Sequence, residues 1–464
     1  MGKRLLDEGF EDFVIIERAD EVGGTWYANR YPGCECDTPS LLYSFSFDNN
    51  IDRSNYYNTQ PEILDYLRDL AEEHGLRSHC KFGHAVTHAK WSDMTSSWKL
   101  TLDSGVTVEA DVVISAIGMF NQPRLPKIDG IDTFKGTTMH TAEWNSEHDF
   151  SRDRVAVIGS AASAVQLVPE LVKIAKQVYL FQRTAHWVIP KNDDLYAQKQ
   201  DIPLPENPKL LNAIRNTMEH EINDFLTFSD PKKLAEFEAS VFKAIDEVRD
   251  PEVRRKLRPT HPFGSRNTLL SNVYYPAFNE TNSELVTEQI THINEHSIVT
   301  NDGKERAVDT IIFATGFDST KLLSAIDVIG RNGQSLSKTW DTSLLAYLGI
   351  MISGFPNLFM IFGPNTHVGS VVSIIEAQVE YILSHLHRMV DGGVASVDVK
   401  PQVMLRYDSQ VQTVLGDKYS WMTDSSSKRT VRIDTTCPFP ITEYRRLTTL
   451  IDPNAFYMTN RKLI

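Results

Sequence analysis

The fold of this chain is decided by the stretch DRVAVIGSAASAVQLVPELVKIAKQVYLFQRTAHW (residues 153–187). The apolar run 155–158 predicts a buried strand, and apolar residues at helical spacing predict a helix over about 162–175. A second buried strand is predicted over 178–182. A strand, a crossover helix and another strand of this length form the βαβ unit of dinucleotide-binding proteins, so the predicted fold class is α/β.

The turn of this unit comes close to the pattern G-x-G-x-x-G/A that holds a pyrophosphate. It consists of Gly159, Ser160, Ala161, Ala162, Ser163 and Ala164. Ala161 stands at the middle glycine, where a methyl group narrows the space but leaves the helix N-terminus that attracts phosphates. Arg183 follows the second strand, nineteen residues after Ala164. An arginine at this place accommodates the 2′-phosphate of NADP, so the pattern predicts NADPH as a cofactor.

The opening stretch GFEDFVIIERADEVGGTW (9–26) indicates a second dinucleotide site. Its apolar run 13–16 predicts a strand that ends at Glu17, and an acidic residue there suits a ribose with a free 2′-hydroxyl, such as that of FAD. The matching glycine-rich loop should lie about 20 residues earlier, upstream of Met1. We therefore expect a chain truncated at its N-terminus, through a start placed too late in the gene. A flavin-free remnant is the alternative.

Two other segments repeat one pattern, WKLTLDSGVTVEADVVISAIG (98–118) and HSIVTNDGKERAVDTIIFATG (296–316). Each predicts a hairpin around D-S-G or N-D-G, followed by an apolar strand that ends in a small residue and glycine. A glycine there lets the backbone approach a ligand closely. Between the two segments, residues 205–258 are predicted as a helical insert that lies beside the active site or only covers the sheet.

Composition excludes several classes of partner. The chain has 464 residues, with 47 basic against 61 acidic side chains and a net charge of −14, which argues against nucleic acid and anionic membranes. The apolar run 344–364 is interrupted by Ser353, Pro356 and Asn357, so we predict two buried strands around a turn in place of a membrane helix. The four cysteines show no C-x-x-C spacing and indicate reduced thiols in a cytoplasmic protein without a metal site. No partner protein is indicated.

Several stretches together resemble one family over nearly the whole chain. They are VGGTWYANRYPGCECDTPSLLYSFSF (22–47), FKGTTMHTAEWN (134–145), GSAASA (159–164), FATGF (313–317) and NLFMIFGPNTHVGS (357–370). The second contains Phe134, Gly136, His140 and Trp144 in the order F-x-G-x-x-x-H-x-x-x-W, and it departs from the family pattern only at Asn145. The chain resembles the flavin-dependent Baeyer–Villiger monooxygenases.

The resemblance implies two Rossmann-like, three-layer ββα dinucleotide-binding domains with the helical insert. FAD would bind residues 1–145 and 311–464, and NADP would bind residues 146–310. The implied reaction uses FAD and NADPH to insert one oxygen atom of O₂ into a ketone, giving an ester or lactone. A bulky ketone of secondary metabolism is one such substrate. Oxygenation of nitrogen or sulfur is an alternative activity, and a truncated, non-catalytic remnant is the alternative without activity.

The resemblance also implies roles for individual residues. The flavin-binding set is Glu17, Gly24, Thr25, Trp26, Asp37, Tyr43 and Val86. The NADP-binding set is Gly159, Ser160, Ala161, Ala162, Ser163, Ala164, Gln166, Arg183, Thr184 and Arg266. The catalytic set is Asp37, Arg266 and Asn267, with Asp37 beside the isoalloxazine ring.

One departure concerns the reaction itself. Registration of GSRNTLLSNVYYPAF (264–278) on the family's segment puts Arg266 at a lysine and Asn267 at the catalytic arginine. A neutral residue there stabilises developing negative charge less, and loss of such a partner costs on the order of 10²- to 10³-fold in rate. In an extended segment neighbouring side chains point to opposite faces, so Arg266 cannot simply replace its neighbour. A one-residue bulge would restore it.

Overall fold

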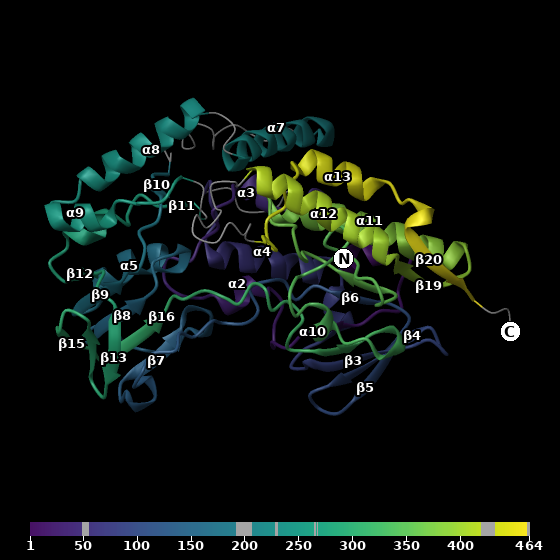
Figure 1. Ribbon diagram of the computed structural model, residues 1–464, viewed down its shortest axis with the longest axis horizontal. Coiled ribbons are helices and arrows are strands. Elements are labelled where there is room, and N and C mark those ends of the chain that lie inside the picture. Colours follow the sequence, from purple (N-terminus) through teal and green to yellow (C-terminus); the bar gives the residue numbers. More distant parts are fainter. Residues whose placement is uncertain are drawn as a thin grey trace.

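The computed structural model describes residues 1–48, 55–191, 207–227, 231–263, 266, 268–418 and 432–461. It is an α/β fold in which helices cover parallel sheets (Figure 1). The predicted fold class is therefore confirmed.

A five-stranded parallel sheet contains the βαβ unit. Its order is β12 (Ser283–Val286), β9 (Gln177–Phe181), β8 (Arg154–Ile158), β16 (Thr310–Phe313), β7 (Thr137–His140). Helix α5 (Ala162–Ile174) joins β8 to β9, within one residue of the predicted bounds. All four residues of β16 are buried, as expected of a strand covered on both faces. The NADP domain was expected to span residues 146–310. Strand β7 and most of β16 lie outside this range, yet both belong to the five-stranded sheet that contains the βαβ unit.

The repeated pattern forms two similar hairpins. One belongs to an antiparallel sheet of β17 (Asp327–Ile329), β3 (Val86–Ser92), β4 (Ser97–Leu102) and β5 (Thr107–Ala110), in which only β17 pairs in parallel with β3. The other consists of β13 (Ile290–Asn294), β14 (Ser297–Thr300) and β15 (Glu305–Ala307). Each hairpin leads into a parallel strand, β6 (Val113–Ser115) or β16. The predicted hairpin and strand are confirmed in both copies.

Further parallel strands form separate pairs, one of which is β10 (Val188–Ile189) with β11 (Leu269–Leu270). Strand β1 (Ile15–Ile16) pairs with β2 (Cys80–Lys81), and β6 pairs with β18 (Leu358–Met360). Helix α4 (Gln60–Glu73) begins with a capping box, in which Glu62 accepts the N–H of Thr59 at 2.7 Å. Helices α11 (Val371–Asp391) and α13 (Ile441–Thr449) pack with the antiparallel pair of β19 (Val394–Val399) and β20 (Phe456–Asn460) in one hydrophobic core.

The apolar run 344–364 is buried over most of its length, but only part of it is a strand. Residues 358–360 form β18, whereas 347–351 form an isolated bridge around a turn. One of the two predicted strands is thus confirmed and the other is wrong, because the chain folds back before a ladder forms. Among the described residues, no helix is long and apolar enough to cross a membrane.

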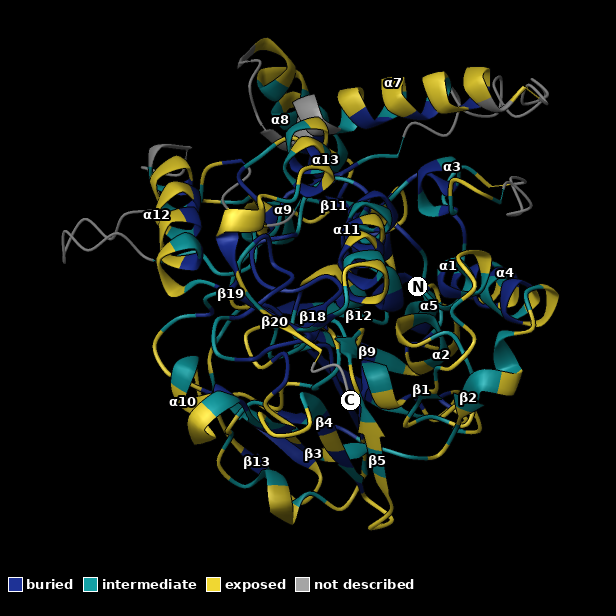
Figure 2. Cartoon of the chain, turned by 90° about the vertical axis from the view of Figure 1, so that its right-hand side faces the viewer, coloured by how far each residue is buried: buried dark blue, intermediate teal, exposed yellow. Residues whose placement is uncertain are grey.

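The predicted insert contains three helices, α7 (Pro208–Thr227), α8 (Pro231–Asp246) and α9 (Pro251–Leu257). Val241 and Ile245 of α8 are fully buried against the core that includes Trp187. Figure 2 shows α7 with most of its surface exposed and its buried residues along the inner edge. Arg215 on that edge donates to the carbonyl oxygen of Ser44 at 2.8 Å. The insert therefore both covers a sheet, through α8, and reaches the N-terminal third of the chain, through α7.

The remaining elements are short helices and strands, apart from α12. They are α1 (Gly2–Asp7), α2 (Thr25–Ala28), α3 (Ser40–Tyr43), α10 (Leu336–Thr339), α12 (Pro401–Lys418), β10 (Val188–Ile189), β11 (Leu269–Leu270), and the 3₁₀ helices at Leu76–His79, Ile131–Thr133, Thr141–Glu143, Pro276–Asn279, Arg331–Gly333 and Pro453–Ala455.

Candidate functional site

The glycine turn after β8 has the backbone that a pyrophosphate needs. Gly159 has a φ of +112°, and a Cβ atom there would lie 2.3 Å from the carbonyl oxygen of Ala314. Only glycine fits this close approach to the end of β16. Helix α5 begins at Ala162, and its N-cap residue, Ala161, makes no side-chain capping hydrogen bond. The first-turn N–H groups are left for a phosphate, so the turn fits NADP.

The neighbouring turn after β9 carries the groups predicted to bind the 2′-phosphate. The Ser160 hydroxyl donates to the carbonyl oxygen of Thr184 at 3.0 Å, which ties the two turns together. Arg183 is exposed beside it. Arg266 is also exposed. The pKa of His186 is lowered to about 4, first by burial of its ring and second by the positive charge of Arg266. Two arginines thus lie near the residues that follow β9.

The second predicted dinucleotide site includes Glu17, which directly follows β1. Its N–H donates to the carbonyl oxygen of Lys81 at 3.0 Å, and its Oε1 accepts the N–H of Ala19 at 2.7 Å. Gly24 begins α2 with a φ of +50°, and a Cβ atom there would meet nothing within 4 Å. The open backbone at Gly24 and the fixed carboxylate of Glu17 fit a second dinucleotide, FAD.

Aromatic and apolar side chains complete this surface. Trp26 Nε1 donates to the Tyr43 hydroxyl at 2.9 Å, and the two rings lie edge to face at 5.6 Å. Burial raises the pKa of Tyr43, so its hydroxyl stays neutral. Thr25 is exposed, and Val86 is half-buried at the start of β3, opposite Leu102.

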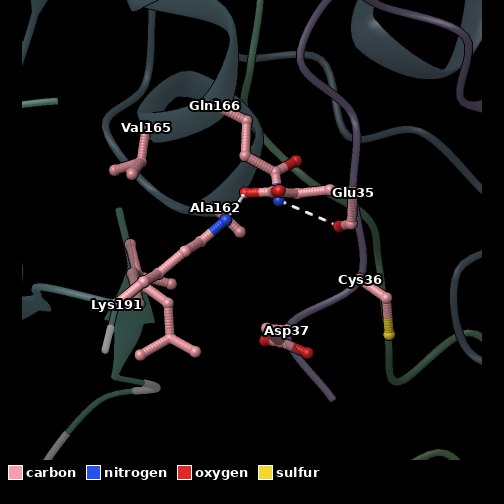
Figure 3. Close-up of a pocket in the computed structure, with 9 residues that line it drawn as sticks. Glu35, Cys36, Asp37, Ala162, Val165, Gln166 and Lys191 are labelled. Atoms are coloured by element: carbon pink, nitrogen blue, oxygen red, sulfur yellow. Dashed lines mark hydrogen bonds and ion pairs between the residues drawn. The ribbon is translucent and has the colours of Figure 1, made fainter. Parts of the chain in front are cut away.

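The segment that carries Asp37 is held against α5. A Cβ atom at Gly33 would lie 2.6 Å from the carbonyl oxygen of Gln166, which shows how closely the segment approaches the helix. Gln166 Nε2 donates to the carbonyl oxygen of Glu35 at 3.0 Å, and the N–H of Cys36 donates to the carbonyl oxygen of Asn58 at 2.9 Å. The predicted flavin side and the predicted NADP side therefore meet at this segment (Figure 3).

Asp37 lies in a cleft, and solvent reaches its side chain. The surrounding protein still shifts the pKa of the carboxylate. Burial raises the pKa of Asp37, whereas His367 and Lys191 lower it. A cavity beside it is lined by Glu35, Cys36, Asp37, Ala162, Val165, Gln166, Lys191, Leu269 and Leu270. Residues of the glycine-turn helix, the Asp37 segment and strand β11 thus share one cavity.

Of the predicted residues, Asp37, Ala162 and Gln166 line this cavity, together with residues that were not predicted. Asn267 lies outside the described residues, so its predicted role stays a prediction, as do the roles of Asp37 and Arg266. The sequence reasoning missed Lys191, Glu35 and His367. The one available signal was the alternation of charge and cysteine at 34–37, because an extended segment would put Glu35 and Asp37 on one face.

Comparison with known proteins agrees with this geometry. The family described as "FMO-like: Flavin-binding monooxygenase-like" matches residues 3–383. A Baeyer–Villiger monooxygenase of Streptomyces coelicolor is 36% identical, over 97% of this chain and 88% of that protein.

Solved structures are also similar over nearly their whole length. The closed structure of cyclohexanone monooxygenase has a TM-score of 0.86 at 26% identity and covers 99% of this chain and 96% of its own. Steroid monooxygenase bound to NADP has a TM-score of 0.84 at 29% identity, with the same coverage. The chain belongs to the flavin-binding monooxygenase-like family and is an FAD- and NADPH-dependent monooxygenase of the Baeyer–Villiger type.

Proposed function

We propose that the substrate is a ketone, into which the chain inserts one oxygen atom of O₂ to give an ester or lactone. The observation that carries this proposal is that Asp37, which is exposed to solvent, lines a cavity together with residues of α5 and β11. Cyclohexanone, which appears in the name of a structurally similar enzyme, is also a ketone.

In this proposal FAD, once reduced by NADPH, supplies the activation of O₂. The chain's own residues bind, orient and shield. Glu17, Gly24, Thr25, Trp26, Tyr43 and Val86 hold the flavin nucleotide. The turn from Gly159 to Ala164, with Gln166, Arg183, Thr184 and Arg266, holds the nicotinamide nucleotide. Asp37 faces the reacting groups, and the half-buried Trp26–Tyr43 pair shields that side from water.

The domain assignment follows the sheets. We assign NADP binding to the five-stranded sheet from β7 to β16 together with the insert, and FAD binding to the segments on either side of it. This extends the range 146–310 to include the edge strand β7 and the interior strand β16, because both pair within the same sheet.

A second segment borders the proposed ketone site. The N–H of His367 donates to the carbonyl oxygen of Thr435 at 3.1 Å, and the N–H of Cys437 donates to that of His367 at 3.1 Å. Residues 434–437 therefore run along His367, which faces Asp37. This position supports a role for 434–437 in shaping the substrate pocket.

The test supplies the FAD-reconstituted chain with NADPH, ¹⁸O₂ and three substrates: a cyclic ketone, a thioether and a tertiary amine. We expect NADPH consumption together with a lactone that carries one ¹⁸O atom. A sulfoxide or N-oxide as the main product, with no lactone, would contradict the ketone assignment. Consumption of NADPH without any oxygenated product would contradict it as well.

A further inference from the structure

The reaction site needs a fixed positive charge, and the described structure offers one that the family resemblance does not assign. Oxygen insertion builds negative charge, which is costly in an enclosed site unless a cation lies nearby. The sequence places a neutral residue, Asn267, where the family has its arginine. The source of the charge must therefore be sought elsewhere in the cleft.

Arg266 lies at the wrong end of a strand pair to provide it. Strands β10 and β11 run parallel, with Val188 opposite Leu269. Arg266 precedes β11, and its charge acts on His186 and His261 near the amino end of the pair. Lys191 follows β10 at the carboxyl end, where the side chain of Asn272 donates to its carbonyl oxygen at 3.1 Å. Arg266 and Lys191 therefore lie at opposite ends of the β10–β11 pair.

Lys191 extends from that end into the cavity beside Asp37. Its ammonium group forms an ion pair with Glu35 and lies 5.4 Å from the centre of the Tyr57 ring. Its side chain is 13% exposed. Figure 3 shows Lys191 stretched across the cavity to Glu35, with Asp37 nearby on the same segment as Glu35. Glu35, Asp37 and Lys191 all line this one cavity, so the ammonium group lies on the same side of the segment as both carboxylates (Figure 3).

The other titratable group that faces Asp37, His367, does not supply a positive charge at neutral pH. His367 approaches from the loop after β18, and burial lowers its pKa, so its imidazole is neutral at pH 7. Its Nδ1 atom is buried without a hydrogen-bond partner in the described structure. Tyr43 on α3, with its raised pKa, and the buried thiol of Cys36 are also neutral there. A lysine ammonium, in contrast, is normally charged at this pH.

We propose that Lys191 is a positioning residue of the reaction site, which favours the charged form of Asp37 and gives the cleft its fixed positive charge. Glu35 holds the ammonium group in place and competes with Asp37 for it. This inference rests on the proposed function only for its effect on oxygenation, since the effect on Asp37 requires no cofactor.

The first test measures the protonation of Asp37 directly. A carbodiimide with excess amine labels protonated carboxyl groups, so peptide mass spectrometry across a pH series gives the midpoint of Asp37 labelling in the whole chain. We expect Lys191→Met to move this midpoint to higher pH and Glu35→Gln to move it to lower pH. If the ion pair were only a brace between segments, both variants would loosen the cleft, expose Asp37 and move the midpoint in the same direction.

The second test concerns the reaction. In the FAD-reconstituted protein, Lys191→Met should lower the oxygenated product formed per NADPH consumed, with a loss in oxygenation rate on the order of 10²-fold. Lys191→Arg should restore most of it. Unchanged coupling in Lys191→Met, with an unmoved labelling midpoint, would overturn the inference. A wild-type chain that oxygenates no ketone would overturn the proposed function, while the labelling midpoints would still decide the role of Lys191.

Discussion

His140 Nε2 lies 3.1 Å from the carbonyl oxygen of Gly316, which joins the end of β7 to the end of β16. The other ring nitrogen accepts the N–H of Ala142 at 3.1 Å, so Nε2 carries the hydrogen and donates. Burial lowers the pKa of His140, and the ring is neutral at pH 7. The histidine of the sequence fingerprint is thus a link between two strand ends.

His140→Ala should destabilise the fold, because it leaves the carbonyl oxygen of Gly316 and the N–H of Ala142 without partners. We expect a loss of about 1–3 kcal/mol in the free energy of unfolding, measured by urea denaturation. His296→Ala, at an exposed position, serves as the control and should change little. An unchanged midpoint in His140→Ala would show that the link contributes nothing to stability.

Arg183→Ala should weaken the binding of NADP⁺ and NADPH but not that of NAD⁺. Loss of a charge-assisted contact of about 1.5–3 kcal/mol predicts a roughly 10- to 100-fold higher dissociation constant for NADP⁺. The dissociation constant for NAD⁺, which lacks the 2′-phosphate, should hardly change. Isothermal titration of both nucleotides checks this, with the exposed Arg406 replaced by alanine as the control. Equal weakening of both nucleotides would contradict a 2′-phosphate contact.

Glu219→Gln should loosen the insert. Glu219 on α7 accepts hydrogen bonds from Arg445 on α13 at 2.9 and 3.1 Å and from Ser373 on α11. Its side chain is buried, whereas that of Arg445 is 37% exposed, so we expect a loss of about 2 kcal/mol. Hydrogen exchange of α7 should rise more than that of β8. Glu221→Gln, on the exposed face of the same helix, should have no such effect.

Asp398→Asn should stabilise the fold at neutral pH. Burial raises the pKa of Asp398 to about 6, against the lowering effects of the Gly354 N–H at 2.9 Å and of Arg331. The folded state therefore binds the proton more tightly than the unfolded state, and stability falls as pH rises from the unfolded value of 3.8 to about 6. Asparagine does not titrate, so the Asp398→Asn variant keeps its stability over this pH range.

Thermal unfolding at pH 4 and pH 7.5 measures the effect of this substitution. We expect the Asp398→Asn variant to gain about 3 kcal/mol at pH 7.5 and less than about 1 kcal/mol at pH 4. Asp391→Asn, which changes an exposed carboxylate, should behave as wild type at both pH values. A gain of equal size at both pH values would mean that protonation of Asp398 is not its cause.

Local patterns in the sequence predicted several elements correctly. The βαβ unit, both hairpins and the helical insert follow from periodicity and turn residues, which act over a few neighbouring positions. The error in 344–364 has the same origin. An apolar run shows that a segment is buried, but it does not show whether a partner strand lies alongside, so the bridge at 347–351 was taken for a strand.

The sequence by itself determined the class of fold, the glycine turn at 159–164, and the arginine at 183 that follows the second strand. Each depends on residues close together in the chain. Only the tertiary structure decided that Lys191 meets Glu35, 156 positions away, and that His140 meets Gly316, 176 positions away. Each contact arises where separate strands and loops end side by side, and side-chain spacing within an element does not report which other elements end beside it.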